Sequence, residues 1–571
     1  MSKTVAQYII DRLSQEVDHA FCFVGGAAIF LTDALNNSTI KPVFNLHEQA
    51  CAIAADAYGQ YSNKLGLCIV TAGPGTLNAL TGVAAAYFDS IPMIILSGQT
   101  NTFHLSGDNL RTKGIQEVKT EEIVKPIVKK VYTIRNPTAA PQIIEDAIFF
   151  AKEGRPGPVW IDIPLDIQNK IIEEDYPNYF KMPQYSSRTS WYFLDNLLSA
   201  KQPAILVGNG VRLDKAEGYL YDILNTFLHI PILTTWGATD LFEENHPLYV
   251  GRPGMIGQRG ANWIIQNCDY LLCLGARLDL GTVAFDYQNF APKAMKYIVD
   301  IDQAELGKYC GTDESWLGIC DSIYNFCKQL HLHLLRNHLS YNNPEWLAQC
   351  KKLHDQPIET IPPTEGTLSL YQFIEQLTPY LKDKVIALGS SGTVAEVFLQ
   401  SFKVQPGCRI INSGGLGSMG FGLPAAIGAH YASGKPVIML DGDGSFALNS
   451  QELALVSGAN LPICMIIINN GGYLSIKNTQ NNLCEGRQLG VDETYGLYLP
   501  NYEKMAKSYN LPYYKIIDKD SIHSVQYTID MAYPCIIEVF TDPYHKTQCR
   551  TTTNKQPDGT MKASGLENLW P

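Results

Sequence analysis

The sequence lacks a surplus of positive charge and lacks long apolar runs, and each absence excludes a class of protein. Its 44 Lys and Arg residues are outnumbered by 56 Asp and Glu residues, for a formal net charge of −12. A dedicated nucleic-acid-binding protein needs basic residues to neutralise phosphates, so no nucleic-acid partner is expected. Because no run of 18 apolar residues occurs and polar residues interrupt the N-terminal segment, we expect neither a membrane span nor a signal peptide.

The 14 cysteines form no CxxC pair and no dense framework, a pattern typical of reduced thiols in the cytoplasm. At 571 residues the chain is longer than a single core usually serves, and its hydrophobic content of 46% is ordinary for globular proteins. Apolar strand-like runs alternate with helical patterns and are separated by Gly and Pro turns. The sequence therefore predicts about three α/β domains with parallel sheets, located in the cytoplasm.

One stretch of the chain, residues 437–470, predicts a strand, a helix and a second strand. Asp443, between Gly442 and Gly444, follows the first apolar run, and Asn470 follows the second. A right-handed crossover makes the two strands parallel, so both side chains are expected at one sheet edge, where ligands bind. With the Gly472 carbonyl they would offer hard oxygen ligands to Mg²⁺ or Ca²⁺.

The same stretch contains two further signals. The two glycines that flank Asp443 would let the backbone approach a diphosphate closely. The segment Asn449 to Glu452 predicts the N-terminal cap of the intervening helix. Taken separately, the glycine-rich and asparagine-rich pieces are also compatible with ordinary turns, and it is their spacing that favours a site.

The GDG…NN pair resembles the signature of thiamine-diphosphate (ThDP) enzymes, in which these residues hold the metal that holds the cofactor. Other segments extend the resemblance to acetolactate synthase-like members along essentially the whole chain, namely NLHEQA, IVTAGPGTLNALTGVAAAYFDSIPMIILSGQ and GGLGSMGFGLPAA. The resemblance implies three doubly wound parallel-sheet domains. They are a pyrimidine-binding domain (1–175), a central nucleotide-binding-like domain (190–345) and a diphosphate-binding domain (366–545), followed by a tail (546–571) that is a candidate lid over the active site.

The resemblance also implies roles for individual residues. Glu48 is expected to hydrogen-bond N1′ of the ThDP pyrimidine, Met419 to press between the two rings, and the Gly417 carbonyl to bond the 4′-amino group. The catalytic set is completed by Gln116, Gly25 and Gly26. The other expected cofactor contacts are Gly73, Ser390, Ser391, Gly442, Gly444, Ser445, Asn470 and Gly472, with Asp443, Asn470 and Gly472 as metal ligands. For the Ser390–Ser391 pair, a helix N-cap is an equal alternative.

In acetolactate synthases the central domain binds FAD, so the residues that match that pattern mark a candidate nucleotide site. They are Arg155, Gly208, Gly210, Met255, Gly275, Arg277 and Asp279. Ile256, however, stands where a histidine is usual. FAD, another nucleotide and an empty fold therefore stay open.

Three departures from true synthases concern the channel for the second substrate. Leu165 replaces a lysine, Gly281 an arginine and Thr479 a tryptophan. Losing two cations and an indole would widen this acceptor pocket and weaken its hold on a carboxylate. We therefore predict that a 2-oxo acid, pyruvate above all, is decarboxylated and joined to an aldehyde, ketone or keto-sugar.

Four alternatives remain: acetolactate synthase, a simple 2-oxo acid decarboxylase, an oxalyl-CoA-type lyase and a non-catalytic ThDP-fold regulatory protein. The lyase would need a dedicated basic cluster for CoA, which the sequence does not show, and the regulatory protein is disfavoured because Glu48 and the complete metal motif are present. Because Glu48 and Asp443 lie in different domains, the resemblance implies a homodimer as the minimal unit and a homotetramer as the expected assembly.

Overall fold

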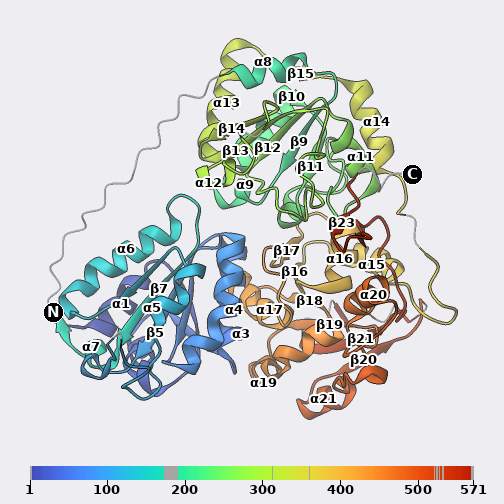
Figure 1. The fold of residues 1–571 in the computed structure, drawn as a ribbon. Coiled ribbons are helices and arrows are strands. Elements are labelled where there is room, and N and C mark those ends of the chain that lie inside the picture. Colours follow the sequence, from blue (N-terminus) through green and yellow to red (C-terminus); the bar gives the residue numbers. More distant parts are fainter. Residues whose placement is uncertain are drawn as a thin grey trace.

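The computed structural model describes residues 3–107, 109–172, 191–310, 313–358, 361–519, 521–522, 525, 528–529 and 533–566. Three parallel sheets, each covered by helices, follow one another along the chain (Figure 1). The predicted α/β class with three parallel sheets is therefore confirmed. No helix in these ranges is both long and apolar enough to cross a membrane.

The first sheet has six strands in the order β3-β2-β4-β5-β7-β6. Its central strands are fully buried apolar runs, as expected for a parallel sheet with helices on both faces. The strands are β2 (His19–Cys22), β3 (Lys41–Phe44), β4 (Gly66–Val70), β5 (Met93–Gln99), β6 (Lys130–Thr133) and β7 (Pro158–Pro164). The main helices are α1 (Val5–Leu13), α3 (Glu48–Ser62), α4 (Pro74–Asp89) and α6 (Ala140–Lys152).

The middle sheet has five strands in the order β11-β9-β12-β13-β14, and the third has six in the order β17-β16-β18-β19-β21-β20. The middle strands are β9 (Pro203–Val207), β11 (Ile232–Thr234), β12 (Tyr270–Leu274), β13 (Met295–Asp300) and β14 (Trp316–Cys320). Those of the third sheet are β16 (Val385–Leu388), β17 (Arg409–Ile411), β18 (Val437–Gly442), β19 (Ile463–Asn469), β20 (Tyr513–Ile516) and β21 (Cys535–Phe540). Helices that matter below are α11 (Arg259–Asn267), α13 (Ile323–Asn337), α16 (Gly392–Ser401), α17 (Gly422–Ser433) and α20 (Leu474–Leu483).

In each sheet the second strand along the chain lies on one side of the first strand and the third strand on the other side, and ligands of open α/β sheets bind at such a reversal. The reversal lies between β2 and β4 in the first sheet, between β9 and β12 in the second, and between β16 and β18 in the third. The glycine-rich turns singled out in the sequence follow these six strands directly. The topology thus places these six turns where a ligand can reach the backbone, while the glycine-rich segment 412–420 follows the edge strand β17.

The first and third sheets share one apolar core through the helices α3 and α17 (Figure 1). The contact surface of α3 is built largely of alanine, and Gly428 of α17 lies so close to the Ala54 carbonyl that a Cβ there would overlap it. Small side chains therefore allow the two helices to approach closely. The first and third domains form one body, and the middle domain lies above them in Figure 1.

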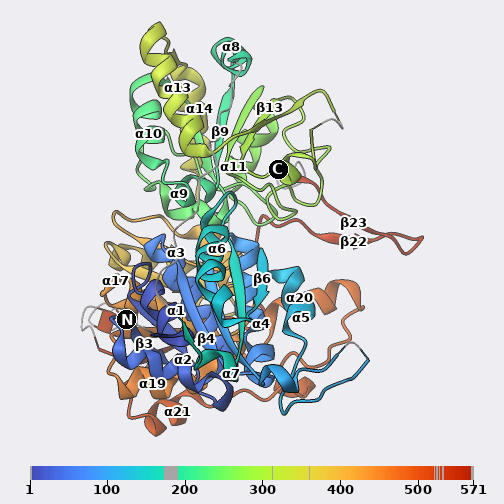
Figure 2. The ribbon, with the colours of Figure 1, turned by 90° about the vertical axis from the view of Figure 1, so that its left-hand side faces the viewer.

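The tail runs back along the middle domain. The Met255 carbonyl accepts the Thr551 N–H at 2.7 Å, and Leu566 is 3% exposed within the core of the middle domain. Between them a hairpin of β22 (Thr553–Lys555) and β23 (Met561–Ala563) projects from the body (Figure 2). The tail therefore docks on the middle domain through Leu566, and residues 567–571 lie outside the described residues.

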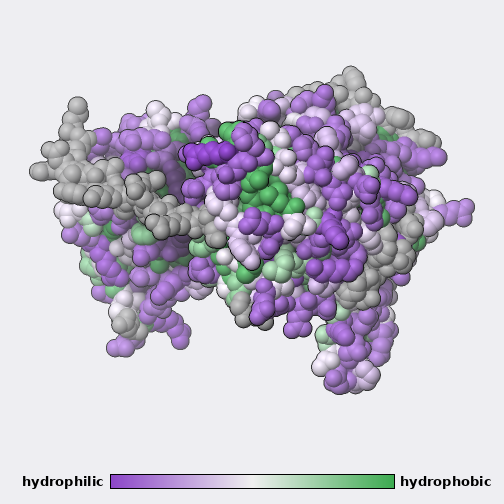
Figure 3. Space-filling view, turned by 90° about the horizontal axis from the view of Figure 1, so that it is seen from above, coloured by the Kyte–Doolittle hydropathy of each residue, from purple (hydrophilic) through white to green (hydrophobic). Residues whose placement is uncertain are grey.

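Seen from the side of the middle domain, the surface is mostly hydrophilic, with one small hydrophobic group near the centre of the view (Figure 3). This distribution is typical of the exterior of a globular domain. Residues 173–190, between the first and middle domains, lie outside the described residues.

Candidate functional site

The edge of the third sheet brings Asp443 and Asn470 together, because β18 and β19 pair in parallel with Gly442 opposite Ile468. Asp443 is 2% exposed, and its Oδ1 and Oδ2 accept the backbone N–H groups of Gly444 at 2.7 Å and Gly472 at 3.0 Å. Burial raises the pKa of Asp443 to about 6. Asn470 Oδ1 is buried without a hydrogen-bond partner among the described residues. A buried carboxylate beside an unsatisfied amide oxygen fits a bound divalent cation.

Two details qualify the predicted metal set. The Gly472 N–H points to Asp443, while its carbonyl, the predicted ligand, accepts the Leu474 N–H at 3.1 Å. In the described part of the chain no group of three or more His, Cys, Asp or Glu side chains could hold a metal. A cation here would therefore depend on one carboxylate, one amide and backbone or phosphate oxygens.

A second buried acid, Asp441, lies on β18, two residues before Asp443. Asp441 accepts hydrogen bonds from the Gly442 N–H at 2.8 Å and the Ser445 hydroxyl at 3.0 Å, and burial raises its pKa to about 7. Ser445 Oγ in turn accepts the Gly420 N–H at 3.0 Å. The recorded contacts of this hydroxyl, which was predicted to bind the cofactor, are with the protein, and they join the metal edge to the glycine-rich loop.

That loop, residues 412–420, connects β17 to α17. Gly417 and Gly420 have φ of +66° and +77°, which L-residues rarely adopt, so glycine is required there. Met419 is half-buried. The loop is fixed to the turn after β16, since Ser390 Oγ accepts the Ser413 N–H at 2.9 Å.

The neighbouring Ser391 occupies the N-cap position of α16, but its side chain makes no capping hydrogen bond. Ser391 thus has the position of an N-cap, but neither serine hydroxyl makes a capping hydrogen bond. Ser390 is a support for the glycine-rich loop instead.

In the first sheet, the turns after β2 and β4 enclose Glu48, the first residue of α3. The Glu48 carboxylate is 6% exposed, and its Oε2 accepts the Asn78 side-chain N–H at 3.0 Å. A Cβ on Gly25 would overlap the Thr71 side chain, and one on Gly75 would lie 3.5 Å from Glu48 Oε1. Gly26, which begins a short 3-10 helix, has open space at its Cα. The predicted activating acid is therefore buried beside glycine-containing turns of its own domain.

Gln116 lies against the same turns. A Cβ on Gly73 would approach the Gln116 carbonyl oxygen to 2.6 Å, and Gln116 itself is exposed with φ +57°. The adjacent Glu117 carboxylate accepts the backbone N–H groups of Ser106, Lys113 and Gly114, which holds its pKa at about 2 despite some desolvation. Glu117 thus gives the Gln116 loop its shape.

A cavity of about 710 Å³ lies between all three domains. Six of the seven residues predicted for a nucleotide line it: Arg155, Gly210, Met255, Gly275, Arg277 and Asp279. The seventh, Gly208, lies directly behind, where a Cβ would overlap the Gly275 carbonyl. The predicted nucleotide residues are therefore brought together at the reversal point of the middle sheet.

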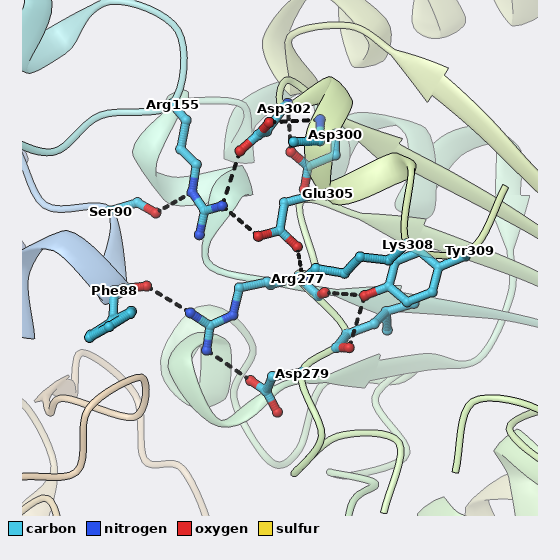
Figure 4. Close-up of polar contacts among 12 residues, drawn as sticks. Phe88, Ser90, Arg155, Arg277, Asp279, Asp300, Asp302, Glu305, Lys308 and Tyr309 are labelled. Atoms are coloured by element: carbon cyan, nitrogen blue, oxygen red, sulfur yellow. Dashed lines mark hydrogen bonds and ion pairs between the residues drawn. The ribbon is translucent and has the colours of Figure 1, made fainter. Parts of the chain in front are cut away.

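Two arginines from different domains give this cavity its polarity (Figure 4). Arg155 donates to Ser90 Oγ at 2.8 Å, Glu305 at 2.7 Å and Asp302 at 3.2 Å. Arg277 donates to the Phe88 carbonyl at 2.8 Å and lies 3.3 Å from Asp279. Cationic and anionic groups alternate on the wall, which suits a ligand with both phosphates and hydroxyl groups.

The three residues predicted for the acceptor pocket are not brought together within one chain. Leu165 begins the short helix α7 (Leu165–Gln168) in the first domain, Gly281 lines the cavity described above, and Thr479 is exposed on α20 of the third domain. In Figure 1, α7 and α20 lie on opposite sides of the molecule. A pocket containing all three would need residues from a second chain.

Sequence reasoning missed two acids that join domains, one half-buried and one buried. Asp89, at the end of α4, accepts the Ser413 hydroxyl and the Gly415 N–H, both at 2.8 Å, and burial raises its pKa to about 6. The other is Glu452, which was interpreted as part of a helix cap. Helix α19 (Leu453–Gly458) does begin after Glu452, which occupies its N-cap position, but the Glu452 side chain makes no capping hydrogen bond and binds Leu46 and Asn45 instead. No short-range signal in the sequence marks either long-range contact.

With this geometry established, comparison with known proteins decides the family. Residues 3–123 match the N-terminal TPP binding domain of thiamine pyrophosphate enzymes, residues 193–330 the central domain, and residues 390–539 the C-terminal TPP binding domain. The chain belongs to the thiamine pyrophosphate enzyme family. The implied ThDP dependence is thereby confirmed at the level of the family.

The relatives cover nearly the whole chain. It is 34% identical over 562 residues to the probable acetolactate synthase large subunit of Methanocaldococcus jannaschii, covering 94% of this chain and 92% of the relative. It is 30% identical over 546 residues to the acetolactate synthase large subunit of Lactococcus lactis, again covering 94% and 92%. The protein is therefore an acetolactate synthase-like, ThDP-dependent enzyme of the decarboxylase and carboligase type.

Proposed function

We propose that this enzyme decarboxylates a 2-oxo acid, pyruvate above all, and joins the resulting acyl unit to an aldehyde, ketone or keto-sugar. The observation that carries the ThDP part is the edge of the third sheet. There a buried carboxylate held by backbone N–H groups lies beside an amide oxygen without a hydrogen-bond partner among the described residues. A metal held by Asp443 and Asn470 would satisfy both groups and leave positions for diphosphate oxygens.

Residues of the first and third domains would have different roles in the reaction. When bound, ThDP supplies a carbon nucleophile and an electron sink for decarboxylation. Glu48 would bind N1′ of the pyrimidine and stabilise a proton there, while Met419 and Gly417 would hold the cofactor rings. Gln116 and the Gly25-Gly26 turn would position the donor carbonyl.

The proposed assembly is a homodimer at minimum and a homotetramer by resemblance. It is supported by the separation of the recorded contacts: Glu48 is bonded within the first domain and Asp443 within the third. A complete site would then combine the first domain of one chain with the third domain of another. The cytoplasm remains the proposed location.

For the central cavity we propose a nucleotide, with FAD first and a related nucleotide second. A volume of about 710 Å³ is suitable for a cofactor, and the two arginines could bind phosphates. Ile256, buried at 1% exposure, offers no hydrogen bond where a histidine is usual. Denaturing the purified protein and identifying the released cofactors by mass spectrometry tests this proposal and the ThDP proposal together.

The reaction is tested with ¹³C-labelled pyruvate and a panel of acceptors, with products identified by mass spectrometry. We expect mixed products from pyruvate and a non-carboxylate acceptor. Acetolactate as the preferred product at low pyruvate would instead support the second candidate, acetolactate synthase, which the named relatives favour. Free aldehyde irrespective of acceptor would indicate a simple decarboxylase.

A further inference from the structure

Glu452 is a buried carboxylate that joins the first and third domains of one chain. It is the last residue of η9 (Ala447–Glu452), and it is 0% exposed. Its Oε1 accepts the Leu46 backbone N–H at 2.9 Å and its Oε2 accepts the Asn45 side-chain N–H at 3.0 Å. The groups around it are neutral donors, and burial raises its pKa to about 7. Such a carboxylate is a costly way to join two domains, so a purpose beyond stability is indicated.

The residues that Glu452 holds lead directly into the catalytic acid. The turn at 45–47 connects β3 to α3, whose first residue is Glu48. His47 caps this helix through its Nδ1, which accepts the Gln49 N–H at 3.1 Å. The direction of the Glu48 side chain therefore depends on two anchors, Asn78 at its carboxylate and Glu452 at the preceding backbone.

Residues 443–452, the segment that ends at Glu452, also contact the proposed cofactor site of the third domain. The segment starts at Asp443. The side chain of Asn449, in the same segment, donates to the Gly420 carbonyl at 2.7 Å. One rigid run of about ten residues thus touches the metal edge, the glycine-rich loop and the Glu48 turn.

We propose that Glu452 is a positioning residue for cofactor activation. By fixing the backbone at Asn45 and Leu46, it holds Glu48 in the orientation needed to bind the ThDP pyrimidine. This inference rests on the proposed role of Glu48. It assigns the function to the geometry of the two hydrogen bonds and not to the charge of Glu452.

Two substitutions separate geometry from charge. In Glu452→Gln the amide oxygen still accepts the Leu46 N–H, and the amide N–H₂ can donate to Asn45 Oδ1, which is buried without a hydrogen-bond partner among the described residues, once the Asn45 amide turns over. In Glu452→Ala the Leu46 N–H and the Asn45 side chain both lose their partner. The glutamine variant should therefore preserve the turn and the alanine variant should loosen it.

The experiment uses the full-length enzyme and three measurements. They are the affinity for ThDP with Mg²⁺ by calorimetry, hydrogen–deuterium exchange at C2 of bound ThDP, and backbone amide exchange of the Leu46 peptide without cofactor. For Glu452→Ala we expect C2 exchange to slow by about 10 to 10²-fold, as for other small misplacements of catalytic groups, and faster Leu46 amide exchange. Cofactor affinity should stay within about threefold of the wild type. Glu452→Gln should resemble the wild type in all three measurements.

Asp56→Asn is the matched control. Asp56 is a second fully buried carboxylate on α3, about two helical turns beyond Glu48, and its recorded side-chain bond is with Gln60 at 3.2 Å. This change should alter thermal stability and leave C2 exchange unchanged. An equal slowing in Asp56→Asn and Glu452→Ala would overturn the proposal, because it would reflect general loosening of α3.

Two further results would refute the positioning role of Glu452. Wild-type C2 exchange in Glu452→Ala despite a mobile Leu46 amide refutes the positioning role, and so does a Glu452→Gln variant as slow as the alanine variant. The Glu48→Gln variant separates the proposed role of Glu48 from the proposed role of Glu452. If it exchanges at the wild-type rate, the proposed function of Glu48 fails; if it is slow while Glu452→Ala is normal, the role of Glu452 alone fails.

Discussion

The acids at the polar edges of the first and third sheets are held in different ways. At the first edge, Asn78 binds the Glu48 carboxylate and Glu452 binds the turn before it. At the third edge, backbone N–H groups surround Asp443, and Asn470 Oδ1 has no hydrogen-bond partner among the described residues. Asn45 Oδ1 and Thr71 Oγ1, at the first edge, lack one there as well. The third edge is therefore distinguished by a buried carboxylate beside a free amide oxygen, which indicates a cation, and the first by an acid that neighbouring side chains already orient.

The largest expected effect comes from breaking the third edge. Asp443→Ala removes the one carboxylate of the proposed metal set, so the diphosphate loses its clamp. The loss should exceed the roughly 10 to 100-fold that follows removal of an outer partner of a metal site. Calorimetry on the folded variant measures it, and unchanged ThDP affinity would show that the metal lies elsewhere.

Breaking the first edge should leave binding intact and affect activation. Glu48→Gln keeps the size of the side chain, but a neutral amide cannot stabilise a proton at N1′ as a carboxylate does. We expect C2 exchange in bound ThDP to slow on the order of 10² to 10⁴-fold, the usual range for a positioned acid–base group. An exchange rate equal to that of the wild type would mean that another residue activates the cofactor.

The contrast also predicts how stability depends on pH. The pKa values of Asp441, Asp443 and Glu452 are raised by burial to about 7, 6 and 7, above those of the unfolded chain. The unfolded state then releases these protons first as pH rises, so each group lowers the free energy of unfolding by up to roughly 1.4 kcal/mol per pH unit between its two pKa values.

Thermal unfolding checks this directly. Without cofactor, the unfolding temperature should fall between pH 5 and pH 7.5 through these groups. Mg²⁺ with ThDP should reduce the fall, because a cation stabilises the ionised form of Asp443. Asp443→Asn should show a smaller fall and no such rescue. A cofactor-free protein whose stability rises over this range would contradict the assignment.

The sequence predicts the third edge better than the contacts between domains, and the reason is physical. Asp443 and Asn470 follow buried strands of one strand-helix-strand unit, so local pattern and crossover handedness place them. The bond from Asn45 to Glu452 spans 407 positions, and that from Ser413 to Asp89 spans 324. Such contacts depend on how α3 packs against α17, which local patterns do not encode. For the same reason the sequence places Glu452 near a helix start but does not predict its bonds to Asn45 and Leu46.

The smallest expected effect concerns the acceptor pocket, whose predicted residues are not brought together within one chain. Thr479 is exposed on α20, and its hydroxyl bonds to the Ser475 carbonyl of its own helix at 3.0 Å, so a larger side chain has room there. If Thr479 faces the acceptor channel of a dimer, Thr479→Trp should narrow the range of acceptors while pyruvate consumption falls by no more than about threefold. The donor contacts, Gln116 and the Gly25-Gly26 turn, lie on the first domain and are untouched. The comparison requires pyruvate consumption and carboligation products to be measured separately, with Thr479→Val as a control that removes the hydroxyl but adds no bulk. An acceptor range identical in all three proteins would place Thr479 outside the channel, and the case for a wide, uncharged pocket would then rest on Leu165 and Gly281 alone.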